Sequence, residues 1–313
     1  MNESVRSDLE RAAVDIRQAA PMMKSAAWAS LSVAAFLIAL KFAAGLYTGS
    51  VSILSSLVDS VLDLLASAVN LFAITQAMTP ADRRHRFGHG KAEAIGSLIQ
   101  AAVMAGSAAF VVFEAASRFV SPQPVRQPEA GIGVMLVSIA ATAALVLYQR
   151  RVVRRTGSTA VSADSLHYTS DILTNLSVIA ALAIAGYTGF TLADPLFAIG
   201  IALYLGWSAW SIVRASFHVL MDQELPDTDR AVIKELILGQ PGVLSLHDLR
   251  TRSSGANVFI QFHVEVDRSL SLLSAHEIAD HVETVLLGRY PGAEVIVHVD
   301  PQGVIERRDH FER

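Results

Sequence analysis

Six long apolar segments constrain this chain more than any other feature of its sequence. A helix needs about 20 residues, each rising about 1.5 Å, to cross the hydrocarbon core of a bilayer. The segments that meet or approach this length are Met23–Tyr47, Val51–Met78, Ala92–Val120, Ala130–Tyr148, Ala160–Tyr187 and Ala193–Val213. They predict an α-helical membrane protein with six transmembrane helices.

Composition and charge agree with a membrane protein. Only 17% of the 313 residues are charged, against about 25% in an average soluble domain. The net charge of -4 excludes a generally basic nucleic-acid-binding protein. The chain has no cysteine, which excludes disulfide scaffolds and thiolate metal sites.

Basic residues gather before the first apolar segment and in alternate connections after it. They are Arg6, Arg11, Arg17 and Lys24; Arg83, Arg84, Arg86 and Lys91; and Arg150, Arg151, Arg154 and Arg155. The remaining connections carry only Arg118 and Arg126. The positive-inside rule therefore predicts that both termini are cytoplasmic.

After residue 221 the sequence changes to that of a small soluble domain. Helical and alternating patterns follow in the order helix, strand, strand, helix, strand, which predicts a small α+β domain with helices on one face of a three-stranded sheet. The expected organisation is a cytoplasmic arm over 1–22, a transmembrane domain over 23–221, a cytoplasmic α+β metal-binding domain over 222–303 and a loose tail over 304–313.

Two pairs of polar side chains interrupt the apolar segments. Asp59 and Asp63 lie in the second segment, and His167 and Asp171 in the fifth. Each pair has i, i+4 spacing, so its members project from one helix face. A carboxylate at the bilayer centre costs about 2.5–3.5 kcal/mol on insertion scales. The pairs could serve as interhelical hydrogen bonds, but unpaired carboxylates would repel one another, which favours a four-ligand site for a divalent metal.

Two further groups have the composition of metal sites. Asp82, His85 and His89 fall within eight residues of the connection after the second apolar segment, where the alternative is a solvated basic loop. In the C-terminal domain the candidate ligands are His247, His263, His276, His298 and Asp300. Strand alternation puts His263 on the face opposite Ile260 and Phe262. The alternative is a set of ordinary surface histidines.

Several linked motifs carry a resemblance to a known family. They are LVDSVLD, PADRRHRFGHGKAE, DSLHYTSD, LMDQELPD, HDLRTRSSG and VIVHVDP, in that order along the chain. Over about residues 23 to 303 the chain resembles the cation diffusion facilitator family, most closely its bacterial members. The resemblance implies a homodimeric divalent-metal/proton antiporter of the bacterial inner membrane, with a metallochaperone-like cytoplasmic domain and no enzymatic activity.

The same resemblance implies roles for the three groups. Asp59, Asp63, His167 and Asp171 form the transport site, Asp82, His85 and His89 a loop site, and the C-terminal ligands a two-ion cluster at the dimer interface. His281 has no role in the pattern. The expected partners are a second copy of the chain, divalent metal ions, protons and the lipid bilayer, without nucleic acid or nucleotide.

Protonation chemistry gives the expected mechanism. Metal binds ionised carboxylates and neutral imidazole, so loading releases protons and protonation expels the metal. Zinc is the expected ion, as substrate and as regulator, while Cd²⁺, Fe²⁺ and Mn²⁺ share part of this ligand set. A membrane-anchored metal sensor without flux is the main alternative. A metalloenzyme would need an open metal position, and a channel would need weaker binding than a closed four-ligand site gives.

Overall fold

The computed structural model describes residues 16–48, 51–120, 129–188 and 192–304. It divides into two compact units, one over Arg17–Leu220 and one from Met221 onward, and each is considered separately. Most of the expected N-terminal arm and nearly all of the expected tail, residues 1–15 and 305–313, lie outside the described residues.

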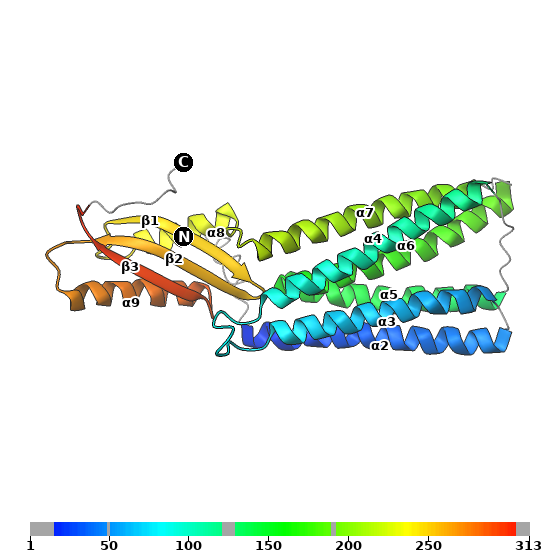
Figure 1. Ribbon diagram of the computed structural model, residues 1–313, viewed down its shortest axis with the longest axis horizontal. Helices are drawn as coiled ribbons and strands as arrows, with labels where there is room; N and C mark the ends of the chain where they lie inside the picture. Colours follow the sequence, from blue (N-terminus) through cyan, green and yellow to red (C-terminus); the bar gives the residue numbers. More distant parts are fainter. Residues whose placement is uncertain (1–15, 49–50, 121–128, 189–191, 305–313) are drawn as a thin grey trace. The chain divides into compact units, whose positions relative to one another are not determined.

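Among the residues described, the first unit contains six long helices, which run alongside one another (Figure 1). They are α2 (Ile16–Thr48), α3 (Val51–Ala77), α4 (Lys91–Val120), α5 (Glu129–Thr156), α6 (Thr159–Thr188) and α7 (Ala193–Leu220). Each of the six apolar segments lies within one of these helices, apart from Met78 just after α3. Helices α2, α5 and α7 extend beyond their apolar segments because backbone hydrogen bonding continues through polar sequence.

Five of these helices are long and apolar enough to cross a membrane by length and composition. Within the described residues the spans are Ala19–Tyr47, Asp59–Ala77, Lys91–Ser117, Gly133–Thr156 and Pro195–Leu220. The sixth helix, α6, carries Asp164, His167 and Asp171 together with several Ser and Thr residues. The unit also exposes large apolar side chains, such as Phe72, Phe113 and Leu203, as expected for surfaces that face lipid.

Helix α6 occupies the centre of this packing. It contacts α3, α4, α5 and α7. Its contact with α2 includes the Ser30 hydroxyl, which donates to the Asp164 carboxylate at 2.5 Å. Helices α3 and α4 approach closely at Gly96, where a Cβ atom would collide with that of Ala73. The polar residues of α6 therefore face neighbouring helices.

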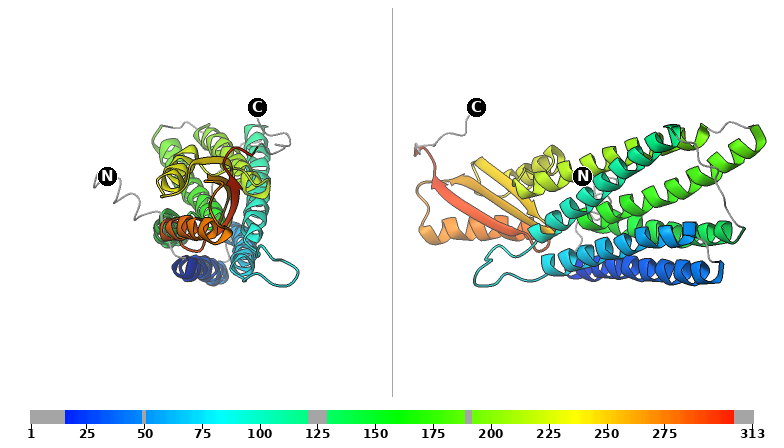
Figure 2. Two further views of the ribbon diagram at one scale, coloured as in Figure 1. Left: turned by 90° about the vertical axis from the view of Figure 1, so that its left-hand side faces the viewer. Right: turned by 45° about the vertical axis from the view of Figure 1, so that its right-hand side comes forward.

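The second unit is a three-stranded sheet covered by two helices. Its elements are α8 (Asp227–Leu238), β1 (Ser245–Ser254), β2 (Asn257–Val266), α9 (Leu272–Arg289) and β3 (Glu294–Pro301). The sheet order is β1-β2-β3, with β1 antiparallel and β3 parallel to β2. This confirms the predicted order of helices and strands; Figure 2 gives two more views of the sheet.

Alternation along β2 separates the two faces of the sheet. Ile260, Phe262 and Val264 are buried in one core with Ile233 and Ile237 of α8, and with α9 residues Val282 and Leu286. At about 25 cal/mol per Å² of apolar area removed from water, burying side chains of this size gives the main stabilisation of such a small domain. His263 lies on the opposite face, as the alternation predicted.

A β-bulge interrupts β1 between His247 and Arg250. Asp248 has a φ of 49° there, in the left-handed region that asparagine and aspartate tolerate better than most residues. Because the bulge adds one residue, the alternation of β1 reverses across it. His247 before the bulge and Arg250 and Arg252 after it therefore share the face that carries His263.

Candidate metal sites

Three polar side chains from α3 and α6 converge inside the first unit. His167 is only 5% exposed, and its Nε2 atom lies 3.0 Å from Asp63 Oδ1 and 3.9 Å from Asp171 Oδ2. Each of the three residues offers a ligand atom within 4.8 Å of the others. We call Asp63, His167 and Asp171 the helix cluster. Its oxygen and imidazole ligands suit a zinc-like divalent cation.

Asp59, the fourth expected ligand, lies outside this group. It is one turn before Asp63 on α3, and its side chain is exposed in the single chain. Positions i and i+4 are separated by about 6 Å along a helix, so two such carboxylates meet at one point only when their side chains turn toward each other. The structure therefore brings together three of the four residues, and the role of Asp59 stays a prediction.

Buried hydrogen bonds position the two helices of the cluster. Asp164, one turn before His167, accepts hydrogen bonds from Ser30 of α2 and, at 2.7 Å, from the Gln149 amide of α5. The Tyr168 hydroxyl lies 2.8 Å from the Ser67 hydroxyl of α3. These bonds join α6 to three neighbours, with partners that could not be predicted from sequence spacing. Ser and Gln residues at helical spacing within apolar segments could have indicated such hydrogen bonds between helices.

The beginning of α6 has an unusual cap. Ser158 accepts from the backbone N–H of Val161, as an ordinary N-cap does. The buried Glu93 of α4 then accepts from the Ser158 hydroxyl at 2.5 Å and from the Ala160 N–H at 3.2 Å. A carboxylate at a helix N-terminus is favoured by the helix dipole. Glu93 thus fixes the first turn of α6 against α4.

The connection between α3 and α4 forms a second group, the loop cluster of Asp82, His85 and His89. His89 Nε2 lies 3.1 Å from His85 Nδ1 and 3.6 Å from Asp82 Oδ2. Asp82 Oδ1 accepts from the backbone N–H groups of His85 and Arg84, and these two bonds hold the Asp82 pKa below its ordinary value. Each of the three residues has a ligand atom within 4.8 Å of the others, and the loop site stays a prediction.

A third group, the sheet cluster, lies on the face of the sheet opposite α8 and α9. It comprises His247, His263, His298 and Asp300. His247 pairs with His263 across β1 and β2, and His263 pairs with His298 across β2 and β3, so the three imidazoles form a row. Asp300 is 3% exposed and lies within 3.0 Å of His263 and His298 and 3.2 Å of His247. Three imidazoles around one carboxylate fit a zinc-like ion.

His276 does not join this cluster within one chain. It is exposed on α9, with its Nε2 atom 3.5 Å from Asp280 Oδ2. Helix α9 covers the opposite side of the sheet from His263, so a single copy cannot bring His276 to the row of imidazoles. The structure thus assembles four of the five residues expected here.

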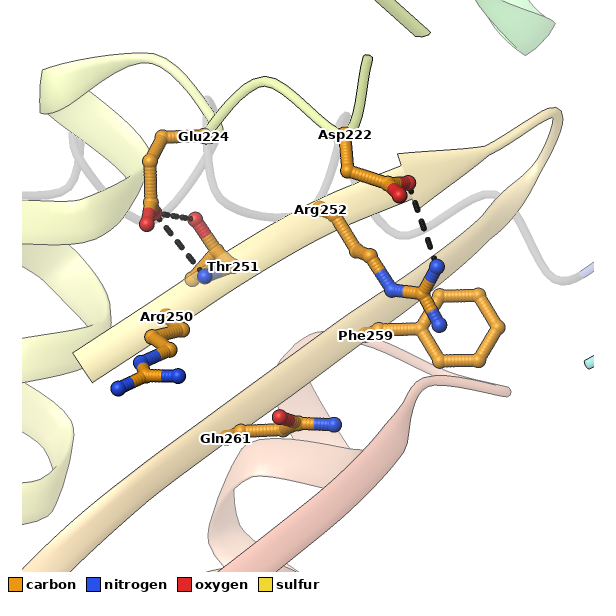
Figure 3. A pocket seen from close by; sticks show the side chains of 7 residues that line it. All are labelled: Asp222, Glu224, Arg250, Thr251, Arg252, Phe259 and Gln261. Carbon is orange, nitrogen blue, oxygen red and sulfur yellow. Dashed lines mark hydrogen bonds and ion pairs between the residues drawn. The ribbon is translucent and has the colours of Figure 1, made fainter. Parts of the chain in front are cut away.

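A pocket of about 220 Å³ opens on the same face of the sheet, beyond the cluster (Figure 3). Arg252 lies 3.2 Å from Asp222 and stacks over the Phe259 ring at 4.4 Å from its centroid. Glu224 accepts from both the backbone N–H and the hydroxyl of Thr251. These contacts join the segment before α8 to β1, so we assign the pocket a structural role.

Comparison with known proteins identifies both units. Residues 27–221 match the family model described as the cation efflux transmembrane domain, and residues 225–302 match the one described as the cation efflux protein cytoplasmic domain. The chain is 45% identical over 297 residues to the cation-efflux pump FieF of Yersinia pestis strain Pestoides F, covering 94% of this chain and 99% of the relative. The same values apply to FieF of Yersinia pseudotuberculosis serotype O:3.

Among solved structures, the second unit is similar to the metal-bound C-terminal domain of the CzcD transporter from Thermotoga maritima. The sequence identity is 30%, the match covers 26% of this chain and 95% of that one, and the TM-score is 0.24. Two family models that together span most of the chain, and relatives matched over nearly their full length, lead to one conclusion. The chain is a multi-pass membrane transporter for metal cations, not an enzyme, and belongs to the cation diffusion facilitator family.

Proposed function

We propose that this chain exports divalent metal cations, zinc foremost, in exchange for protons across the cytoplasmic membrane of a bacterium. It acts as a homodimer with both termini in the cytoplasm, and Cd²⁺, Fe²⁺ and Mn²⁺ are further candidate substrates. The transport site consists of the helix cluster with Asp59. The observation that carries this proposal is the convergence of Asp63, His167 and Asp171 between helices α3 and α6.

Proton exchange follows from the ligands of the helix cluster. A divalent ion binds neutral imidazole and ionised carboxylates, and each of these groups can take up a proton instead. Free imidazole titrates at about pH 6.5, within the physiological range. When the site opens to the cytoplasm it loads metal, and when it opens outward protons displace the metal. No nucleotide is needed for this cycle.

The sheet cluster gives the transporter a regulatory metal site. His247, His263, His298 and Asp300 would hold the ion, and such an ion would cross-link strands and stabilise a dimeric arrangement of the domain. His276 of a second copy is the expected further ligand, since its own chain keeps it away from the row of imidazoles. An effector of this kind acts only through different affinities for different transporter conformations.

A metal sensor without flux is the alternative that the ligand sets also allow. It uses the sheet cluster as its receptor and treats the helix cluster as a structural contact between α3 and α6. The two proposals differ in one observable, because only a transporter moves metal across a sealed membrane.

The decisive test is flux in proteoliposomes. Purified protein is reconstituted, and Zn²⁺ uptake is followed with a trapped fluorescent indicator under an imposed pH gradient. We expect uptake that follows the gradient and stops when a proton ionophore removes it. Asp63→Asn should abolish uptake, while the matched control Glu114→Gln, a carboxyl group of α4 outside the cluster, should retain it. Metal binding with no wild-type uptake would favour the sensor.

A further inference from the structure

Lys41 is a charged residue inside an apolar helix, next to the helix cluster. It lies within the membrane span Ala19–Tyr47 of α2, and its Nζ atom donates a hydrogen bond to the Ser60 hydroxyl of α3 at 2.7 Å. Ser60 is 1% exposed and follows Asp59 directly. An ammonium group in the hydrocarbon region is expensive unless it has anionic partners, and it usually marks a functional site.

The anionic partners of Lys41 are the carboxylates of the proposed transport site. The carboxylates of Asp63, Asp59 and Asp171 lie close enough to interact electrostatically with its ammonium group. The same ammonium group is among the charges that act on Asp59 and on Asp171. Lys41 and the three carboxylates thus form one electrostatic group, although they come from three different helices.

The formal charge of this group is matched to a divalent cation. A bound metal requires ionised carboxylates and a neutral imidazole, so in that state three carboxylates and one ammonium group leave two negative charges. One divalent cation neutralises them. A site without Lys41 would keep one negative charge after binding the same ion. Net charge in a medium of low dielectric constant costs free energy. The site that contains Lys41 should therefore favour a divalent cation, which leaves no net charge.

We propose that Lys41 is a specificity-determining residue that tunes the transport site to cations of charge +2. Lys41 is a fixed internal cation and not a metal ligand, because an ammonium group has no lone pair to offer. The inference rests on the proposed function of the helix cluster. It adds a role for α2, which contributes no ligand to that cluster.

A structural role for Lys41 makes a different prediction. If Lys41 only joins α2 to α3 through Ser60, its replacement changes the stability of the protein but not its preference among cations of different charge. Lys41→Gln retains a hydrogen-bond donor and removes the charge, whereas Lys41→Arg retains the charge. Lys24→Gln, on the same helix and outside the group, is the matched control.

The experiment compares Zn²⁺ with Tb³⁺ in full-length protein in detergent. An Asp82→Ala/Asp300→Ala background weakens the loop and sheet clusters, and Asp63→Ala in that background identifies the signal of the transport site. Calorimetry gives the Zn²⁺ affinity, and competition against Tb³⁺ luminescence gives the affinity ratio. Removing one positive charge from this electrostatic group should move the ratio toward Tb³⁺ by roughly tenfold in Lys41→Gln and by little in Lys41→Arg and Lys24→Gln.

The outcomes separate the two proposals. If Asp63→Ala removes no Zn²⁺ binding, the proposed transport site is wrong whatever Lys41 does. If the site binds Zn²⁺ but Lys41→Gln leaves the ratio unchanged, the inference about Lys41 is overturned. If Lys41→Gln does not fold, the protein that retains Lys41 still tests the inference. A site matched to charge +2 must not prefer Tb³⁺ to Zn²⁺. A strong Tb³⁺ preference there contradicts the inference.

Discussion

The helix cluster and the sheet cluster use the same two side-chain types in opposite proportions. The helix cluster combines the carboxylates of Asp63 and Asp171 with one imidazole, and the sheet cluster combines three imidazoles with the carboxylate of Asp300. Carboxylate-rich sites carry net charge, and the helix cluster has Lys41 within its electrostatic range. Imidazole-rich sites are nearly neutral and hold zinc-like ions firmly. The carboxylate-rich helix cluster therefore suits binding and release of a metal ion, and the imidazole-rich sheet cluster suits its retention.

The secondary structure that holds each cluster also differs, in a way that agrees with binding and release at one cluster and retention at the other. The sheet cluster lies on three adjacent strands whose backbone hydrogen bonds fix the spacing of its imidazoles. The helix cluster lies between two helices that can shift against each other without breaking backbone hydrogen bonds. A transport site must open to each side of the membrane in turn, so we expect its ligands to separate more easily than those of the sheet cluster.

The largest expected effect comes from Asp171→Ala. Loss of this ligand should reduce metal affinity at the helix cluster by more than the roughly 10–100-fold that an outer-shell partner costs, and transport should fall to background. Metal binding to the sheet cluster should persist. Proteoliposome flux and calorimetry of the same preparation check both halves of this prediction. Wild-type flux in the variant would contradict the assignment of Asp171.

Asp300→Ala should have the opposite effect, with weaker metal binding at the sheet cluster and retained transport. Asp300 contacts all three imidazoles of the sheet cluster, so its removal should weaken metal binding there by more than the roughly 10–100-fold that an outer-shell partner costs. Some transport should remain because the helix cluster is intact. Calorimetry of the full-length protein should show one class of ions lost, and light scattering should show weaker metal dependence of dimerisation. Glu235→Ala, an exposed carboxyl group of α8, is the matched control, and an equal loss there would refute the role of Asp300.

His167→Asp should produce an intermediate effect on the choice of metal. An all-carboxylate helix cluster is harder than one with an imidazole, so the ratio of Mn²⁺ to Zn²⁺ affinity should rise on the order of tenfold. Competition between the two ions during uptake measures this ratio. If the ranking of metals is unchanged, the imidazole does not determine selectivity.

The smallest expected effect concerns the loop cluster. Its ligands are two histidines and Asp82, whose pKa is lowered by the backbone N–H groups of His85 and Arg84. Because the lowered pKa keeps Asp82 ionised well into acid, its carboxylate should stay available for metal binding at mildly acidic pH. Asp82→Ala should remove this binding and change flux by less than about twofold, since the helix cluster has its own ligands. Calorimetry of the wild-type protein, of Asp82→Ala and of the control Arg83→Ala checks this; wild-type binding at the loop cluster in Asp82→Ala would contradict it.

Much of the fold could be predicted from the sequence because it depends on local patterns. Apolar segments of transmembrane length fixed the places of α2 to α7, and alternation in β2 placed Ile260 and His263 on opposite faces. Spacing within one helix or loop also allows a prediction of which residues lie on the same face. His167 and Asp171 share a face of α6 because i, i+4 positions must, and Asp82, His85 and His89 converge because a short loop offers little room.

Contacts between different helices and strands could not be predicted from the spacing of residues in the sequence. The separation of Asp59 from the helix cluster depends on how α3 lies against α6, and the approach of Lys41 depends on how α2 lies against α3. The face of His247 depends on a bulge after it in β1, which periodicity does not reveal. The sequence alone determined which residues each helix and strand can present. Only the tertiary structure decided which of them meet, because interhelical packing and strand register depend on contacts between residues distant in the chain.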